Sequence, residues 1–204
     1  MTLQSAYPWE AAPAGTAAAR AAQWRAALPR LETARLVLRV PEAADFEAYR
    51  AILMSERAIH MDGPLDREEA WLDFAQVVAT WHLRGHGLFV IEAKATGETL
   101  GFTLIGFEYG DQEPELGWFL TEAAEGQGDE VEAARAVKAW GIAELELPSL
   151  VSYIDRVNTR STALAARLGG WPDEAASAAL GEPGVVVYRH WPPADADGGM
   201  EAYS

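Results

Sequence analysis

The stretch PELGWFLTEAAEGQGDEVEAARA, residues 114–136, decides the fold. It predicts a strand over residues 114–120, a loop that contains Gly126 and Gly128, and a helix whose first turn is acidic. Such a loop offers unpaired backbone N–H groups and the positive end of a helix dipole to an anion. Because glycine loops before helices are often simple turns, the pattern alone is only a weak indication of an anion site.

The segments on either side predict further strands and helices. Strands are indicated where apolar and polar residues alternate, and helices where apolar residues recur at a spacing of three and four. The predicted strands cover residues 35–40, 86–94, 99–109, 114–120, 149–155 and 185–191, and the predicted helices cover residues 41–58, 66–83, 129–145 and 158–169. This order predicts one α/β or α+β domain built around a mixed sheet.

The chain divides into three segments. Residues 1–30 form an Ala-rich appendage with one short predicted helix, residues 31–191 form the domain, and residues 192–204 form a flexible acidic tail. The start of the chain lacks a basic segment followed by an apolar one, and no apolar run approaches the roughly 20 residues of a membrane span. We therefore expect a soluble, cytoplasmic protein with no membrane partner, either a monomer or a homodimer.

The composition excludes several classes of chemistry. The 204 residues include 31 Asp and Glu against 16 Lys and Arg, a formal net charge of -15, and no cysteine. This charge would repel a nucleic acid, and the lack of cysteine excludes disulfides, thiolate zinc sites and a Cys nucleophile. The acidity can serve solubility or adaptation to salt, or it can attract a cationic or amine substrate. His82 and His86 are four residues apart but belong to no metal-binding motif, so we predict no metal.

Five blocks of sequence together resemble the GNAT superfamily of acyl-CoA-dependent acetyltransferases, in the branch of the ribosomal-protein N-terminal alanine acetyltransferases. They occur in the order of that family, from about residue 31 to residue 191. The blocks are LETARLVLR, TGETLGFTLIGF, PELGWFL, EGQGDEVEAARA and SYIDRVNTRSTALAARLGG. The resemblance implies a mixed sheet of six to seven strands, flanked by about four helices and splayed between the strands at residues 114–120 and 149–155.

The resemblance also implies acetyl transfer from acetyl-CoA to a primary amine of a small molecule, a peptide or a protein N-terminus, by direct attack. The pantetheine arm would lie in the splayed gap, and a strand N–H near Phe119 would stabilise the developing oxyanion. Glu115 would be the general base. Tyr153 or Ser161 would protonate the leaving thiolate, or the thiolate would leave with the help of water. The residues expected to bind acetyl-CoA are Trp118, Phe119, Leu120, Gly126, Gln127, Gly128, Asp129, Glu130, Val131, Asn158 and Ser161.

Three of these side chains also have a purely structural interpretation. Glu115 can face water from its strand, Asn158 can act as a helix N-cap, and Ser161 can be an exposed helix serine. Where many GNAT members carry a tyrosine acid, this chain has Ala165.

The loop departs from the pattern of the family. Glu125 stands where Gln or Arg is usual, and Glu130 stands where Gly or Ala is usual. Together with Asp129 they place negative charge where the pyrophosphate would bind. The alternative function is therefore a GNAT-fold binding or interaction module that has lost acetyl-CoA binding.

Overall fold

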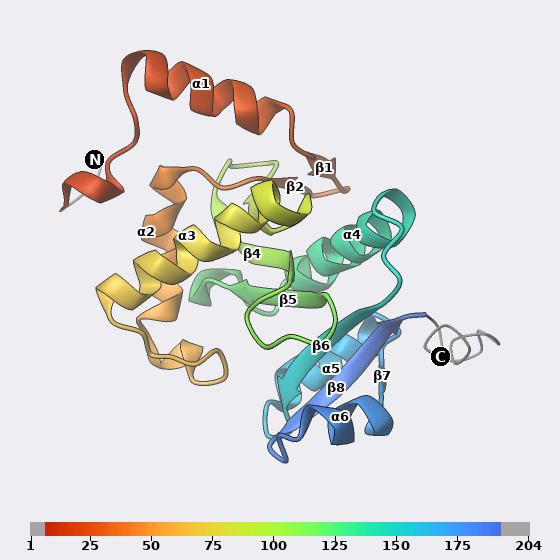
Figure 1. The fold of residues 1–204 in the computed structure, drawn as a ribbon. Coiled ribbons are helices and arrows are strands. Elements are labelled where there is room, and N and C mark those ends of the chain that lie inside the picture. Colours follow the sequence, from red (N-terminus) through yellow and green to blue (C-terminus); the bar gives the residue numbers. More distant parts are fainter. Residues whose placement is uncertain (1–6, 193–204) are drawn as a thin grey trace.

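The computed structural model describes residues 7–192, which form an eight-stranded sheet with helices on both faces (Figure 1). The strands are β1 (Leu31–Glu32), β2 (Leu36–Arg39), β3 (Leu88–Ala93), β4 (Thr99–Gly106), β5 (Glu115–Leu120), β6 (Leu150–Asp155), β7 (Trp171–Pro172) and β8 (Val185–Trp191). The α-helices are α1 (Gly15–Ala26), α2 (Phe46–Leu53), α3 (Arg67–Arg84), α4 (Asp129–Glu144), α5 (Thr159–Arg167) and α6 (Glu174–Leu180). Four 3₁₀ turns, η1 (Pro8–Glu10), η2 (Ala43–Asp45), η3 (Glu56–Ala58) and η4 (Glu122–Ala124), complete the elements.

The sheet order is β1-β2-β3-β4-β5-β6-β8-β7. Only the pair β5 and β6 is parallel, and every other neighbouring pair is antiparallel. A parallel pair needs a crossover, and the loop and helix α4 supply it. The carboxyl ends of β5 and β6 therefore lie at the same edge of the sheet, next to the N-terminal ends of α4 and α5.

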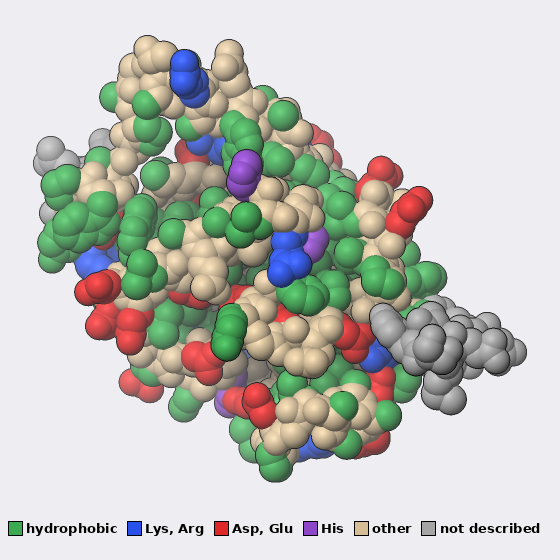
Figure 2. All heavy atoms as spheres, in the orientation of Figure 1, with side chains coloured by type: hydrophobic (Ala, Val, Ile, Leu, Met, Phe, Trp, Pro, Cys, Tyr) green, Lys and Arg blue, Asp and Glu red, His purple; other side chains and the backbone are tan. Residues whose placement is uncertain are grey.

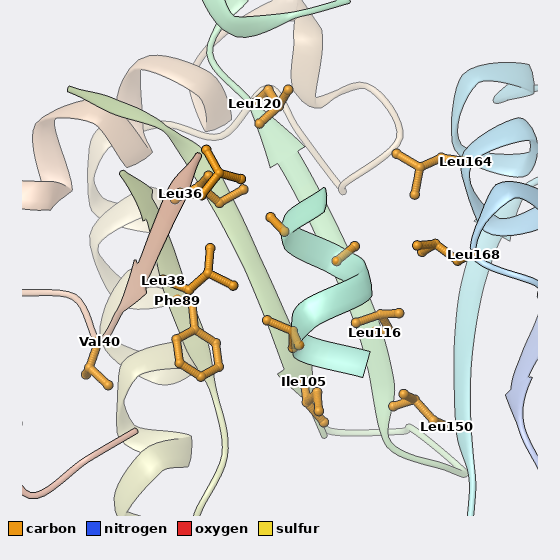
Figure 3. Packing of buried hydrophobic residues seen from close by; sticks show 14 of the residues in the cluster. Leu36, Leu38, Val40, Phe89, Ile105, Leu116, Leu120, Leu150, Leu164 and Leu168 are labelled. Carbon is orange, nitrogen blue, oxygen red and sulfur yellow. The ribbon is translucent and has the colours of Figure 1, made fainter. Parts of the chain in front are cut away.

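Two hydrophobic clusters fix the helices on opposite faces of the sheet. Figure 3 shows apolar side chains of β2 to β5 directed at α4, whose Ala133, Ala134 and Val137 are fully buried. On the other face α2 and α3 pack against β3 and β4, through residues that include Phe74 and Phe102. Burial of this apolar surface is the main source of stability of the fold.

Local signals in the sequence explain where two of the helices begin. The Asp66 side chain accepts the Glu69 N–H at 2.9 Å and the Glu69 side chain accepts the Asp66 N–H at 2.8 Å, which is a capping box for α3. Asn158 caps α5 in the same way, because its Oδ1 accepts the Ser161 N–H at 3.1 Å.

The predicted fold class is confirmed, and the element counts are corrected. The sheet has eight strands instead of six to seven because β1 and β7 are two-residue strands, too short for an alternating pattern to indicate them. The six α-helices of residues 7–192 exceed the predicted four through α1, outside the domain, and α6, which the prediction missed. The predicted helix over residues 41–58 is divided: only α2 is α-helical, with η2 and η3 on its two sides.

The segment before the domain contains η1 and helix α1. Helix α1 buries none of its residues, and the Arg25–Glu42 ion pair at 3.2 Å connects it to the domain. Residues 193–204 of the predicted acidic tail lie outside the described residues. Within the described part of the chain, none of the helices has the length and apolarity that crossing a membrane requires.

Candidate active site

A cavity of about 990 Å³ opens where β5 and β6 separate. The two strands are paired in register only at Glu115 and Val151, with the Val151 N–H donating to the Pro114 carbonyl at 3.0 Å. Both strands line the cavity as they diverge toward their carboxyl ends. The predicted splay of the sheet is therefore present, and it leaves one edge of β5 free for a ligand.

Glu115 lies at the point where the strands separate, and it lines the cavity. Its Oε1 accepts the Tyr153 N–H at 3.3 Å. Burial, followed by the nearby charge of Asp111, raises the pKa of Glu115 from the ordinary 4.5 to about 8, and Glu108 adds to the effect. A carboxyl group with a pKa close to neutral pH is suited to exchange a proton during catalysis.

The free edge of β5 presents the backbone of Trp118 and Leu120. The Thr121 N–H donates to the Leu100 carbonyl of the β4 side at 2.9 Å, and N–H groups alternate in direction along a strand. The N–H of Phe119 therefore points to β4, and those of Trp118 and Leu120 point into the gap. The expected oxyanion donor is therefore the N–H of Trp118 or Leu120 instead of the N–H of Phe119.

The side chains of β5 divide between the two faces of the sheet. Phe119 packs against Tyr49 and Phe102, with ring centroids 5.5 and 5.3 Å away, on the face covered by α2 and α3. Trp118 packs on the opposite face, with its ring 6.2 Å from that of His190. Both residues also line the cavity, as does Leu120.

The glycine loop has the geometry of an anion site. Gly126 and Gly128 have φ values of 76° and 79°, which glycine adopts at no steric cost. Within the described part of the chain, the backbone N–H groups of residues 126–131 have no hydrogen-bond partner. Consecutive free N–H groups at a helix N-terminus fit a diphosphate. Of the residues in this range, only Glu130 lines the cavity.

Arg35 pairs with two carboxylates of the first turn of α4, and neither of them lines the cavity. Its guanidinium pairs with Asp129 at 2.9 Å and with Glu132 at 2.7 Å, and it also donates to the Gln127 carbonyl at 3.1 Å. Val131 packs against the hydrophobic cluster under α4. The negative charge that could oppose an anion is therefore reduced to Glu125 and Glu130.

Glu125 and Glu130 both line the cavity but differ in their contacts. Glu125 is paired with Arg57 and with Arg160, and the hydrogen bond from Arg160 is the largest cause that holds the pKa of Glu125 below its usual range. Burial raises the pKa of Glu130, which makes its carboxyl easier to protonate.

The two candidate acids differ in their availability. The Tyr153 hydroxyl accepts the N–H groups of Gln112 at 3.2 Å and Glu113 at 3.1 Å, so it is used to hold the loop between β4 and β5. Ser161 lines the cavity, and its hydroxyl has no partner among the described residues. Ala165 is fully buried. Ser161 is therefore the candidate that is free to donate a proton.

Several acidic residues that were not singled out in the sequence also lie in the cavity. The Tyr49 hydroxyl donates to Asp73 at 2.5 Å, and burial raises the pKa of Asp73. Burial and the charge of Asp73 raise the pKa of Glu108 to about 7. The sequence contains one indication of Asp73 as a site residue, because this acid directly precedes Phe74 in the apolar stripe of α3. Among the described residues, no group of three or more His, Asp or Glu side chains could hold a metal ion.

Replacing Asn158 by alanine should lower the free energy of unfolding by about 1 kcal/mol, because the Ser161 N–H loses its cap. Asn158→Asp keeps the acceptor oxygen and should preserve the stability. Chemical denaturation of the two variants measures the difference. Equal stability of Asn158→Ala and the wild type would contradict the capping role.

Comparisons with known proteins agree with this geometry. A family model described as an acetyltransferase (GNAT) domain matches residues 35–170. The crystal structure of an acetyltransferase from Agrobacterium tumefaciens is 41% identical, covers 80% of this chain and 94% of its own, and has a TM-score of 0.76. A GNAT-family acetyltransferase described as putative, from Bordetella pertussis, is 26% identical, covers 79% and 97%, and has a TM-score of 0.63. No curated protein sequence gives a match.

The fold is also shared with RimL, a ribosomal L7/L12 alpha-N-protein acetyltransferase whose structure contains coenzyme A. That structure is 17% identical, covers 79% of this chain and 96% of its own, and has a TM-score of 0.61. Since the family model spans more than half of the chain and the Agrobacterium acetyltransferase is 41% identical over 80% of it, the chain belongs to the GNAT family and is an acetyltransferase.

Proposed function

We propose that this acetyltransferase uses acetyl-CoA to acetylate a primary amine, with Glu115 as the general base. The observation that carries the proposal is the position of Glu115 at the fork of β5 and β6, with its pKa raised to about 8. An amine is mostly protonated at neutral pH and must lose a proton to become a nucleophile. Glu115 accepts that proton, directly or through one water.

The remaining groups bind and orient the reactants. The loop N–H groups of residues 126–131 hold the diphosphate of acetyl-CoA, which supplies the thioester when bound. Asn158 and Ser161 position the donor at the N-terminal end of α5, and the N–H groups of Trp118 and Leu120 stabilise negative charge on the carbonyl oxygen. The Ser161 hydroxyl is the proton donor for the departing sulfur, and it regains a proton from solvent. No covalent bond to the protein is needed.

We propose a cationic acceptor because acidic side chains far outnumber basic ones in the lining of the cavity. Besides Glu125 and Glu130, the acidic residues that line it are Glu56, Asp62, Glu69, Asp73, Glu108, Asp111, Glu115, Asp155 and Glu182. Of the described lining residues, Arg57 and Arg160 are the only arginines, there is no lysine, and both arginines pair with Glu125. Acidic side chains are also spread over the face in Figure 2, with few basic ones among them. A negative field of this kind concentrates cations at the site.

The acceptor is a small molecule, a peptide or a protein N-terminus that carries such an amine. Cavity-lining residues outside the loop include Ile59, His60, Met61 and Asp62 before α3, and Leu180, Glu182 and Val185 between the end of α6 and the start of β8. We further propose that the protein works in the cytoplasm, where acetyl-CoA is available.

The first test is thermal unfolding with and without CoA, followed by calorimetric titration. A ligand at a hundred times its dissociation constant adds about 2.7 kcal/mol of stability, so a functional site should give a clear upward shift. Mass spectrometry after incubation with acetyl-CoA and amines should then show an acetylated product. Failure of CoA to bind would support the alternative, a GNAT-fold binding module.

The acceptor charge is tested with n-butylamine and the diamine of the same length. The diamine should have a KM about tenfold lower at low salt, because its second ammonium group interacts with the carboxylates of the cavity. The advantage should shrink as salt is added, since screening weakens exposed charge interactions. Equal KM values at all salt concentrations would contradict a cationic acceptor.

A further inference from the structure

Two arginines from different elements converge on one carboxylate beside the glycine loop. Arg57 comes from η3, and Arg160 comes from the first turn of α5. Arg57 Nη2 pairs with Oε1 of Glu125, and Arg160 Nη2 pairs with Oε2 at 2.8 Å, so that Glu125 bridges the two guanidinium groups. All three residues line the cavity. The Glu125 carboxylate therefore occupies a position between two guanidinium groups that is suited to an anion.

The pairing with Glu125 does not satisfy every hydrogen-bond donor of Arg57. Its Nη2 also donates to the Leu120 carbonyl at 3.3 Å, on the free edge of β5. Its Nε is buried and has no hydrogen-bond partner in the described part of the chain. A buried guanidinium nitrogen without an acceptor is costly, which indicates a site that is completed by another group.

The loop beside Glu125 also contains hydrogen-bond donors that lack acceptors. The N–H groups of residues 126–131 begin directly after Glu125, and they too lack acceptors among the described residues. The carboxylate of Glu125 pairs with one Nη2 of each arginine, but it leaves Arg57 Nε and these N–H groups without an acceptor. One ligand with several acceptor oxygens and more than one negative charge would satisfy both sets of donors.

We propose that Arg57 and Arg160 are ligands of the diphosphate of the acyl donor, and that Glu125 occupies the arginine pair until the diphosphate displaces it. The proposal rests on the proposed use of acetyl-CoA. A guanidinium group presents its N–H donors in a planar fork that matches phosphate oxygens. When the diphosphate binds, Glu125 exchanges its two arginines for water, and it has the room to do so because its side chain is 25% exposed.

This exchange accounts for a carboxylate in an anion-binding loop. Without Arg57 and Arg160, Glu125 would repel a diphosphate, and without Glu125 the two guanidinium groups would repel each other in the free protein. Glu130 remains as the second carboxylate at this end of the cavity. Arg57 and Arg160 balance Glu125 and Glu130 in formal charge.

The test is calorimetric titration of the full chain with CoA, dephospho-CoA and pantetheine. Dephospho-CoA keeps the diphosphate and lacks the 3′-phosphate, whereas pantetheine lacks both. Arg160 is the better arginine to replace, because its side chain is 70% exposed and Arg160→Gln should fold. Arg167→Gln is the matched control, since it removes the same charge from the last turn of the same helix.

We expect Arg160→Gln to bind CoA and dephospho-CoA about tenfold more weakly than the wild type, as for loss of one charged hydrogen bond, with pantetheine unchanged. Glu125→Gln should bind both nucleotides several-fold more tightly, because no charged competitor remains. Arg167→Gln should match the wild type. Arg57→Gln should resemble Arg160→Gln if its melting temperature shows that it is folded.

Three results would overturn the assignment. The first is wild-type affinity of Arg160→Gln for CoA, and the second is an unchanged or weaker affinity of Glu125→Gln. The third is a loss for CoA but not for dephospho-CoA, which would place Arg160 on the 3′-phosphate. Each of these requires that the wild type binds CoA, so they are distinct from failure of the proposed function, in which the wild type binds none of the three ligands.

Discussion

Replacing Glu115 by glutamine should lower kcat for acetyl transfer by about a hundredfold or more, since a general base contributes about 10² to 10⁴ to the rate. Glutamine has nearly the same shape, and its side-chain oxygen can still accept the Tyr153 N–H that Glu115 accepts at 3.3 Å. The fork of β5 and β6 should therefore persist in the variant. Steady-state rates at saturating acetyl-CoA and amine measure the loss.

The pH dependence separates a base from a structural residue. The loss should be greatest below the pKa of the acceptor amine and should shrink at higher pH, because the amine then loses its proton to solvent. With a pKa of about 8, Glu115 itself gains its charge over the same range, so the wild-type rate should rise toward pH 8. A residue with only a structural role would give a constant ratio of rates.

The pH dependence of the free energy of unfolding also reports on the Glu115 carboxyl group. Burial raises the pKa of Glu115 from 4.5 to about 8, so between these values the folded protein holds a proton that the unfolded chain releases. The stabilisation that the protonated Glu115 contributes is fully present below pH 4.5, and it is lost as the pH rises through about 8. Glu115→Gln should therefore gain stability over the wild type as pH is raised from 4.5 to about 8, and not below that window.

Glu122→Gln is the control for both measurements. Glu122 is exposed in η4, and its replacement changes the formal charge by the same amount. Its kinetics and its stability profile should follow the wild type. A wild-type rate of Glu115→Gln at every pH would eliminate Glu115 as the base, whatever the control shows.

The core of the site was predictable from the sequence because it is local. The strand at residues 114–120, the loop and the following helix are contiguous, and their composition specifies the β5, loop and α4 unit that the structure contains. Asn158 was recognisable as a cap from its position before an amphipathic helix, and the structure confirms the bond to Ser161. Such signals act over a few residues, which sequence patterns resolve well.

Contacts between distant segments could not be predicted in the same way. Arg57 and Glu125 are 68 residues apart, and Tyr49 and Asp73 are 24 residues apart. Neither pair follows from propensity or periodicity, because tertiary packing brings the residues together. The direction of the Asp129 side chain depends in the same way on Arg35, at the start of the domain.

Replacing Phe102 by alanine should lower the free energy of unfolding by about 3 to 5 kcal/mol, the range for a phenylalanine removed from a core. Phe102 is 0% exposed in the middle of β4, and its ring lies 5.2 Å from that of Tyr49 and 5.3 Å from that of Phe119. The total stability of a domain is about 5 to 15 kcal/mol, so this loss is a large fraction of it.

Phe102→Ala should also disturb the candidate active site. Phe102 packs against Tyr49 and Phe119, and both of these residues line the cavity. We expect a lower rate of acetyl transfer per folded molecule as well as a lower denaturant midpoint with an unchanged m value. Phe107→Ala removes the same side chain from a half-buried position against Arg84 and should cost only about 1 kcal/mol. If Phe102→Ala lost no more stability than Phe107→Ala, the aromatic cluster would not be the support of the cavity wall, and the position of Tyr49 would depend instead on its hydrogen bond to Asp73.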